Sequence, residues 1–140
     1  MSDKALQTTI LVKPSFNETD PMGIVWHGNY LKFFERAREV LFHTLDYDYS
    51  AMQESGFSFP VVDVQIKYRH PWKLQQEALV SVRIEEYENR LVTAYEVKTE
   101  DGTILTTARI VQMAFDMKIG CALMMCPPIL FRKLGKEYPS

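Results

Sequence analysis

The chain has 140 residues, of which 46% are hydrophobic and 24% are charged, and its formal net charge is −2. This length suits one domain with a sizeable buried core, so we expect a single domain over residues 1–140. The small net charge and the lack of a Lys/Arg cluster argue against a nucleic-acid binder. No stretch approaches the ~20 consecutive apolar residues of a membrane span.

Residues 1–15 show no apolar run that ends in a small-residue cleavage site, so we expect no signal peptide and a cytoplasmic protein. The two cysteines, Cys121 and Cys126, have no second Cys/His pair beside them in the sequence. We therefore expect reduced thiols and no bound metal.

The first predicted element is a strand over residues 7–16, with Ile10, Val12 and Phe16 on one face. Pro14 cannot donate a ladder hydrogen bond, which indicates a sheet edge or a bulge near the end of this strand.

A loop over Asn17–Gly28 follows, rich in turn-forming residues. A loop of this length between two strong elements is typical of a functional segment. The next segment is patterned as a long helix, with Asn29 as the expected N-cap or with a start nearer His27. Its apolar residues recur at helical spacing: Tyr30, Phe33, Phe34, Ala37, Val40, Leu41 and Leu45.

The second half of the chain changes to the two-residue period of strands after a short helix. That helix is indicated by the capping-box spacing of Ser50–Gln53 and ends at Gly56. The predicted strands are Phe59–His70, Ala78–Glu86, Leu91–Thr99 and Thr103–Met117.

Smaller features complete this half. Phe59–His70 places Val62, Val64, Ile66 and Tyr68 on one face, and Thr103–Met117 alternates Leu105, Val111, Met113 and Phe115 with Thr106, Ala108 and Gln112. Asp101-Gly102 predicts a hairpin, and residues 127–134 predict a last helical turn.

This order of elements predicts an α+β fold. Consecutive strands usually pair as hairpins, so about five antiparallel strands would wrap around one long central helix, the hotdog arrangement. Such a sheet leaves an edge open, and edges of this kind are normally covered by a second subunit. We therefore expect a homodimer or a homotetramer.

Asp20 is the first candidate for chemistry because it lies in the loop before the long helix. Residue statistics alone favour a plain Asp-Pro turn. However, the amino end of a helix would keep a nearby carboxylate ionised, and its unpaired N–H groups could bind a carbonyl oxygen that gains negative charge. A base or nucleophile and an oxyanion site would then lie together, as acyl hydrolysis requires.

Competing catalytic motifs are missing from the sequence. No metal-ligand spacing, no Gly-x-Ser-x-Gly elbow and no Gly-rich phosphate loop occurs, which argues against a zinc hydrolase, a serine hydrolase and a nucleotide hydrolase. His27 could simply bond a carboxylate or water near the helix start, and structural roles are the better interpretation of His43 and His70.

Two arginines are further candidates. Arg38 borders the apolar stripe, and a partly buried arginine needs a partner. Pairing with Glu35 in the same helix or with another subunit is the default, and a substrate role stays open. Arg90, in a turn between two strands, could clamp a phosphate-bearing ligand.

The run Asp20–Tyr30, DPMGIVWHGNY, resembles the signature of the 4-hydroxybenzoyl-CoA thioesterase family, which has the hotdog fold and includes the Tol-Pal-associated acyl-CoA thioesterases. Phe33-Phe34-Glu35 and Ala37-Arg38 extend this resemblance along the helix. Pro60-Val61-Val62 and Tyr68–Pro71 fall where the family has its next strand and the following turn.

The resemblance implies an enzyme that hydrolyses an acyl or aryl-acyl thioester to the free acid and coenzyme A. Asp20 matches the catalytic aspartate, as nucleophile or general base, and the backbone N–H of His27 would polarise the thioester carbonyl. A histidine side chain at His27 is linked to activity only in the Tol-Pal-associated branch. The resemblance places the substrate-binding surface at Gly23, Ile24, Val25, Trp26, Gly28, Asn29 and Tyr30.

Arg90 falls where the hydroxybenzoyl branch has basic residues near the coenzyme A phosphates, although Glu88 and Asn89 replace their neighbours. Phe16 replaces a tyrosine of the Tol-Pal-associated branch. No cofactor is implied apart from coenzyme A as part of the substrate, and an acyl carrier protein could replace it. Two alternatives remain open: a hotdog hydratase or dehydratase, and a non-catalytic protein that binds acyl thioesters or acts as a scaffold.

Overall fold

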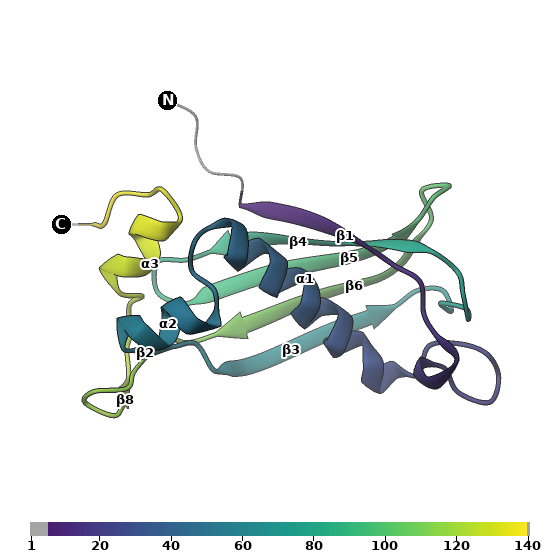
Figure 1. The fold of residues 1–140 in the computed structure, drawn as a ribbon, viewed down its shortest axis with the longest axis horizontal. Coiled ribbons are helices and arrows are strands. Elements are labelled where there is room, and N and C mark those ends of the chain that lie inside the picture. The colour runs from purple at the N-terminus through teal and green to yellow at the C-terminus, as the bar shows by residue number, and fades with distance from the viewer. Residues whose placement is uncertain (1–5, 140) are drawn as a thin grey trace.

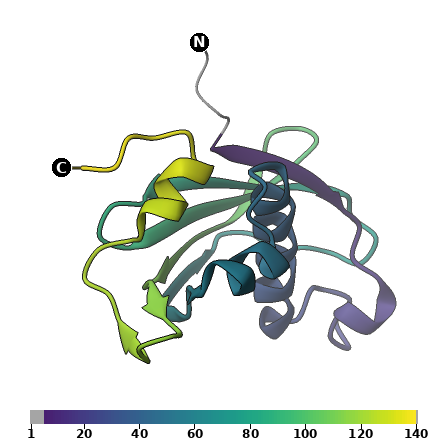
Figure 2. The same ribbon diagram turned by 60° about the vertical axis from the view of Figure 1, so that its left-hand side comes forward.

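The computed structural model describes residues 6–139, and its centre is one helix on the concave face of an antiparallel sheet (Figures 1 and 2). The helix is α1, Tyr30–Thr44. The five strands lie in the order β1-β4-β5-β6-β3. Their bounds are Gln7–Val12 for β1, Val61–Tyr68 for β3, Ala78–Glu86 for β4, Leu91–Thr99 for β5 and Ile104–Gln112 for β6. The predicted hotdog arrangement is confirmed.

The apolar stripe of α1 explains why the sheet curls around it. Phe33, Phe34, Ala37 and Leu41 have no exposed surface, and burying each of the three larger side chains stabilises the fold by roughly 1.5–3 kcal/mol. Val40, which we predicted in the stripe, is 38% exposed and lies at its margin.

The first strand is shorter than predicted. β1 ends at Val12, and a 3-10 turn, η1, spans Phe16–Glu18. Phe16 is 82% exposed, so its predicted place on the buried face of the strand is wrong. Pro14 cannot continue the ladder, and the Ser15-x-x-Glu18 spacing begins a new turn instead.

The short helix α2, Tyr49–Ser55, forms where expected but with a different cap. Its N-cap is Asp48, whose side chain accepts a hydrogen bond from the N–H of Ala51, rather than Ser50. Gly56 ends it in the left-handed conformation at φ 85°, which is strained for most residues other than glycine.

The predicted strand Thr103–Met117 is broken in the structure. β6 ends at Gln112, and a small three-stranded sheet takes over, made of β2 (Phe57–Ser58), β7 (Phe115–Asp116) and β8 (Cys121–Ala122). α3, Pro128–Lys133, follows as the predicted last helical turn.

Cross-strand register decides which face of β6 points toward α1. Thr106 pairs with Val97, and Ala108 pairs with Tyr95, so these residues share the inner face with their buried partners. Thr106 and Gln112 are therefore polar residues buried beside the helix.

The hairpin predicted at Asp101-Gly102 joins β5 to β6, with Gly102 at φ 91°.

β3 is one of the two edge strands of the large sheet, and β1 is the other. Val64, Ile66 and Tyr68 share its inner face as predicted, because they pair with Ile110, Ala108 and Thr106. A bulge between Val61 and Asp63 removes Val62 from that series. Val61, Val62, Val64 and Tyr68 are all exposed.

Within residues 6–139, no helix is both long and apolar enough to cross a membrane.

Candidate active site

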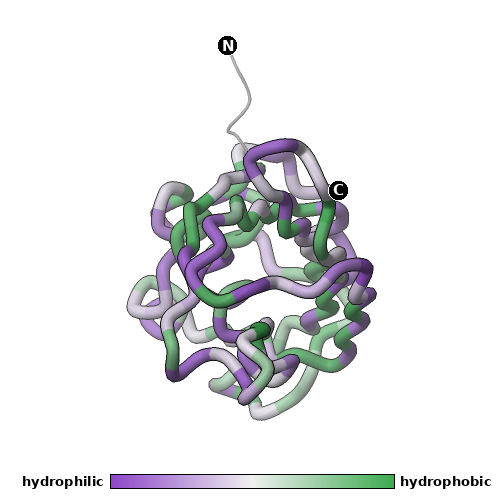
Figure 3. The backbone as a smooth tube through the Cα atoms, turned by 90° about the vertical axis from the view of Figure 1, so that its right-hand side faces the viewer, coloured by the Kyte–Doolittle hydropathy of each residue, from purple (hydrophilic) through white to green (hydrophobic). Residues whose placement is uncertain are grey.

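The loop that carries Asp20 folds into a tight turn at one end of the sheet, the end that faces the viewer in Figure 3. One carboxylate oxygen of Asp20, Oδ1, accepts hydrogen bonds from the N–H of Met22 at 2.9 Å and of Ile24 at 3.3 Å. Gly23 occupies the left-handed conformation at φ 78°. The predicted Asp-Pro turn is present, and it fixes the orientation of the carboxylate.

A second set of bonds attaches this loop to the segment after β3. The N–H of Val25 donates to the carbonyl of Trp72 at 2.7 Å, and the N–H of Leu74 donates to the carbonyl of Gly23 at 2.8 Å. Trp72 is fully buried and its indole N–H donates to the carbonyl of Gln76 at 2.8 Å. The loop is therefore held by the core of the protein.

Glu18 is a part of the site that the sequence analysis did not identify. It is only 8% exposed, and its carboxylate lies 2.6 Å from Nζ of Lys32 on α1 and 2.9 Å from both the N–H and the hydroxyl of Ser15. Its carbonyl accepts hydrogen bonds from the N–H of Trp26 and from the side chain of Asn29. This group of contacts, the Glu18 clamp, joins the loop to the helix start.

The clamp also sets the charge state of Glu18. Burial alone would raise the pKa of this carboxyl, but the hydrogen bonds from Lys32 and Ser15 outweigh it and lower the pKa from 4.5 to about 2. Glu18 thus stays ionised at any pH at which the protein would ordinarily work.

We expect Glu18→Gln to lower the free energy of unfolding at pH 7 by about 1–3 kcal/mol, because a buried charge-assisted contact is lost. The stabilisation from this carboxylate is present above its unfolded pKa of 4.5 and is lost as the pH falls toward the folded value of about 2. Denaturant unfolding of both proteins at several pH values measures this. The difference should shrink between pH 4.5 and 2, and a gap that widened there would contradict the assignment.

The start of the helix supplies the N–H groups that the resemblance requires. A 3-10 turn, η2, spans His27–Asn29 and runs directly into α1, which matches the earlier of the two predicted helix starts. The N–H groups of His27 and Gly28 have no backbone partner among residues 6–139, as is usual for the first turn of a helix. Asn29 occupies the N-cap position of α1 as predicted, but its side chain makes no capping hydrogen bond, because it donates to the carbonyl of Glu18 instead.

The indole ring of Trp26 packs closely against the backbone of Gly28. A Cβ atom at this position would lie 2.0 Å from the indole ring of Trp26. Trp26 therefore covers the helix start, with its ring centroid 5.1 Å from that of His27.

The structure gathers several predicted site residues around one cavity of about 340 Å³ at the helix start. Asp20, Ile24, Val25, His27 and Tyr30 all line it. The sequence analysis did not assign its remaining lining residues to a site: Tyr68, Arg69, His70, Pro71 and Trp72. The family-like run Tyr68–Pro71 was the available signal for most of them.

Tyr30 is more a core residue than a pocket wall, since it is only 3% exposed. Its ring packs edge-on against Tyr68 and Trp72, with centroids 5.0 and 5.9 Å away. Burial raises the pKa of Tyr30, so its hydroxyl stays protonated near neutral pH.

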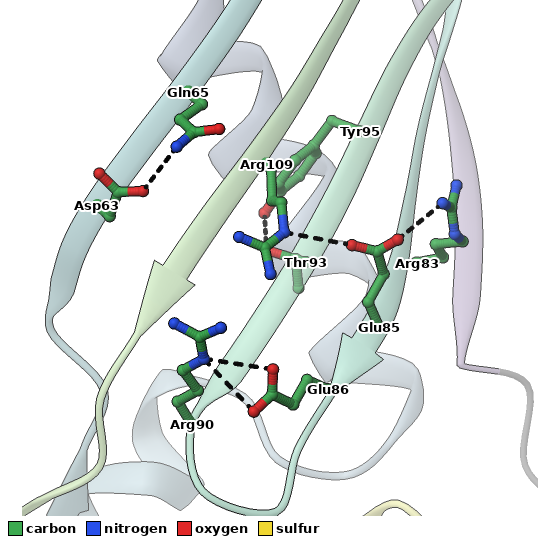
Figure 4. A network of polar contacts seen from close by, with 9 residues as sticks. All are labelled: Asp63, Gln65, Arg83, Glu85, Glu86, Arg90, Thr93, Tyr95 and Arg109. Carbon is green, nitrogen blue, oxygen red and sulfur yellow. Dashed lines mark hydrogen bonds and ion pairs between the residues drawn. The ribbon is translucent and has the colours of Figure 1, made fainter.

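Arg90 is not brought to this cavity within one chain. β4 begins next to the loop and runs for nine residues toward the opposite end of the sheet, a span of about 30 Å. Arg90 lies beyond that end, where its Nε contacts Glu86 at 3.3 Å (Figure 4).

The described residues contain no cluster of three or more His, Cys, Asp or Glu side chains of the kind that a metal site needs.

A curled sheet around one helix, with a carboxylate loop at the helix start, defines a hotdog-fold protein with the layout of a thioesterase. Residues 14–134 match the family model described as the thioesterase-like superfamily. The chain belongs to this family.

The relatives agree with this assignment. The chain is 33% identical over 128 residues to YneP of Bacillus subtilis, provisionally named an acyl-CoA thioesterase, covering 91% of this chain and 88% of YneP. It is 28% identical to the acyl-CoA thioesterase YbgC of Haemophilus influenzae over 74% of this chain and 76% of that protein. A DHNA-CoA thioesterase from Staphylococcus aureus superposes with a TM-score of 0.76 at 27% identity, covering 90% of this chain and 82% of that one.

The predictions of the hotdog fold and of a thioesterase are confirmed. The 4-hydroxybenzoyl-CoA branch in particular stays a prediction, because the relatives that match carry other substrate names.

Proposed function

We propose that this protein hydrolyses an acyl-CoA thioester to the free acid and coenzyme A, with Asp20 as nucleophile or general base. One observation carries the proposal: Asp20 and His27 line the same cavity, at a helix start with unpaired N–H groups. The names of the relatives support the same reaction.

The geometry suits a hydrolysis that needs only one carboxylate and one N–H donor. In the general-base route, Asp20 takes a proton from water while the water oxygen bonds to the thioester carbon. The carbonyl oxygen gains negative charge, which the N–H of His27 can stabilise by about 3–4 kcal/mol. The carbon–sulfur bond then breaks, and the thiolate of coenzyme A leaves and takes up the proton. A thiolate leaves readily, so a strong general acid is not required.

The nucleophilic route differs in its first step. Here a carboxylate oxygen of Asp20 bonds to the thioester carbon, the thiolate leaves, and water then hydrolyses the resulting anhydride. Both routes use the same residues. After a single turnover in ¹⁸O-labelled water, label in Asp20 would establish the nucleophilic route, because water that attacks the Asp20 carbonyl of the anhydride leaves its oxygen there.

The acyl group and the thiol carrier are the parts of the substrate to be tested first. We expect thiol release from a panel of aryl, short-chain and medium-chain acyl-CoA thioesters, detected with a chromogenic thiol reagent. Acyl carrier protein thioesters serve as the comparison. Absence of thiol release from every member, with saturable binding of some, would favour the non-catalytic alternative.

A hotdog hydratase is the other alternative. It would abstract a proton α to the carbonyl and add or remove water without freeing the thiol. Crotonyl-CoA tests this directly, since hydration removes its conjugated double bond and hydrolysis releases coenzyme A. We expect release of coenzyme A.

A second copy of the chain is part of the proposal. The β3 edge is open, and four of its apolar side chains are exposed: Val61, Val62, Val64 and Tyr68. Unpaired strands of this kind recruit another strand. We expect a dimer or tetramer joined along β3, and only a neighbouring subunit could bring Arg90 toward the loop cavity. Light scattering should give a mass of at least two chains of 16.3 kDa, and a monomer would contradict the expectation.

A further inference from the structure

The carbonyl of Glu18 accepts two hydrogen bonds that fix the start of the helix. One comes from the backbone N–H of Trp26 at 3.2 Å, and the other comes from the side-chain N–H of Asn29 at 2.9 Å. Between these two donors in the chain lie His27 and Gly28, whose N–H groups have no backbone partner within residues 6–139. The two donors therefore bracket the peptide groups that would bind the oxygen of a thioester.

Glu18 is a firmly held acceptor, because its side chain is fixed as well. Its carboxylate lies 2.6 Å from Nζ of Lys32 and 2.9 Å from the hydroxyl of Ser15. Only 8% of the residue is exposed. A donor that binds the carbonyl of Glu18 is therefore attached to a fixed point and not to a loop that could move with it.

The same residue leads directly into the turn that carries the candidate carboxylate. Thr19 forms an antiparallel bridge with Val25, and Asp20 follows at once. The carboxylate of Asp20 and the N–H of His27 are thus attached to one anchor from its two sides. Their separation depends on the bonds that the carbonyl of Glu18 accepts.

Asn29 makes the shorter of these two bonds. Its amide can be oriented in only one way, because a carbonyl acceptor requires the NH₂ group. Within the described chain its side chain makes no capping bond, although asparagine commonly does so at this position. The resemblance placed Asn29 in the substrate-binding surface, but it is not among the described residues that line the loop cavity, and its donor is used within the protein.

We propose that Asn29 is a positioning residue for thioester hydrolysis, an inference that rests on the proposed function. By donating to the carbonyl of Glu18, it holds the N–H of His27 where the thioester oxygen gains negative charge. Donors of this kind contribute most when they need not move during the reaction. A misplacement of about 1 Å can cost about a hundredfold in rate.

Asn29→Asp tests this assignment, because an ionised carboxylate has the same shape as the amide but no donor. We expect kcat for thioester hydrolysis to fall at least about tenfold, with KM within about threefold of normal. The melting temperature should change little, because the helix dipole stabilises a carboxylate in the first turn and offsets the lost bond. A merely structural role would lower activity and melting temperature together.

Asn17→Asp is the matched control. It adds the same charge to the same loop, but Oδ1 of Asn17 accepts from the hydroxyl of Ser15 at 2.6 Å, and an aspartate can accept this bond equally well. It should keep normal kcat. Asn29→Ala removes the donor without adding a charge and should lower kcat as Asn29→Asp does. Normal kcat in both Asn29 variants would overturn the proposal, as would a raised KM at unchanged kcat.

Infrared spectroscopy reads the effect of the N–H on the substrate without turnover. A thioester with a ¹³C-labelled carbonyl, bound to Asp20→Asn, should show its C=O stretch at lower wavenumber than in water, because the N–H polarises the carbonyl. Adding Asn29→Ala should remove most of this shift while the thioester still binds, and a shift of full size would contradict the role of Asn29. If the unaltered protein releases no thiol, the proposed function fails, whereas the infrared comparison still decides whether Asn29 positions this N–H.

Discussion

Asp20→Asn should lower kcat/KM for thioester hydrolysis by at least about a hundredfold, because an amide can act neither as a base nor as a nucleophile. The fold should be unchanged. An asparagine carbonyl can still accept the hydrogen bonds that Oδ1 of Asp20 receives from Met22 and Ile24. Thiol release measures the activity, and thermal unfolding followed by circular dichroism verifies the fold.

Asp46→Asn is a matched control for this variant. Asp46 is exposed and lies just beyond the carboxyl end of α1, with φ at 58°, a conformation that asparagine tolerates well. It should keep full activity. Near-normal turnover by Asp20→Asn, with the control also active, would refute the catalytic role.

Trp72→Ala should lower the free energy of unfolding by about 3–5 kcal/mol, the usual range for a fully buried large aromatic side chain. Trp72 has no exposed surface, and its ring lies 5.0 Å from that of Phe33 and 5.9 Å from that of Tyr30. Trp72 also lines the loop cavity, so activity should fall together with stability. Urea unfolding measures the change.

Trp72→Phe separates packing from hydrogen bonding at the same position. It keeps an aromatic ring but leaves the carbonyl of Gln76 without its donor, for a loss of roughly 1–2 kcal/mol. Activity should stay within a few-fold of normal, because an aromatic ring still packs beside Tyr30 and Phe33. If Trp72→Ala cost less than about 1 kcal/mol, the role given to this residue in fixing the loop would be wrong.

The regular elements could be predicted closely wherever one strong pattern decided them. β4 has the predicted bounds because its inward residues, Ala78, Val80, Val82 and Ile84, are all apolar. β5 also has the predicted bounds, although Thr93 interrupts its apolar series, because turn formers border it on both sides. The predicted strand Thr103–Met117 could not be resolved in this way, since its break after Gln112 depends on contacts of β7 with β2 and β8.

The candidate site was predictable where its residues are contiguous. Asp20 and His27 belong to one motif, and the structure brings them to one cavity. The Glu18 clamp was missed although the Ser15-x-x-Glu18 spacing signals a turn, because nothing local indicates that Lys32 lies across from it. The position of Arg90 relative to the loop follows from the length and direction of β4, which a motif cannot convey.

The way Trp26 covers Gly28 has a practical use. The chain has only two tryptophans: Trp26, which is half exposed beside His27, and Trp72, which is fully buried. A substrate that displaces water from the helix start should therefore change tryptophan fluorescence, because Trp72 lines the loop cavity and Trp26 lies beside His27, which also lines it. The protein contains its own optical reporters of occupancy at the loop cavity, and Trp26→Phe would leave the response of the buried Trp72 alone.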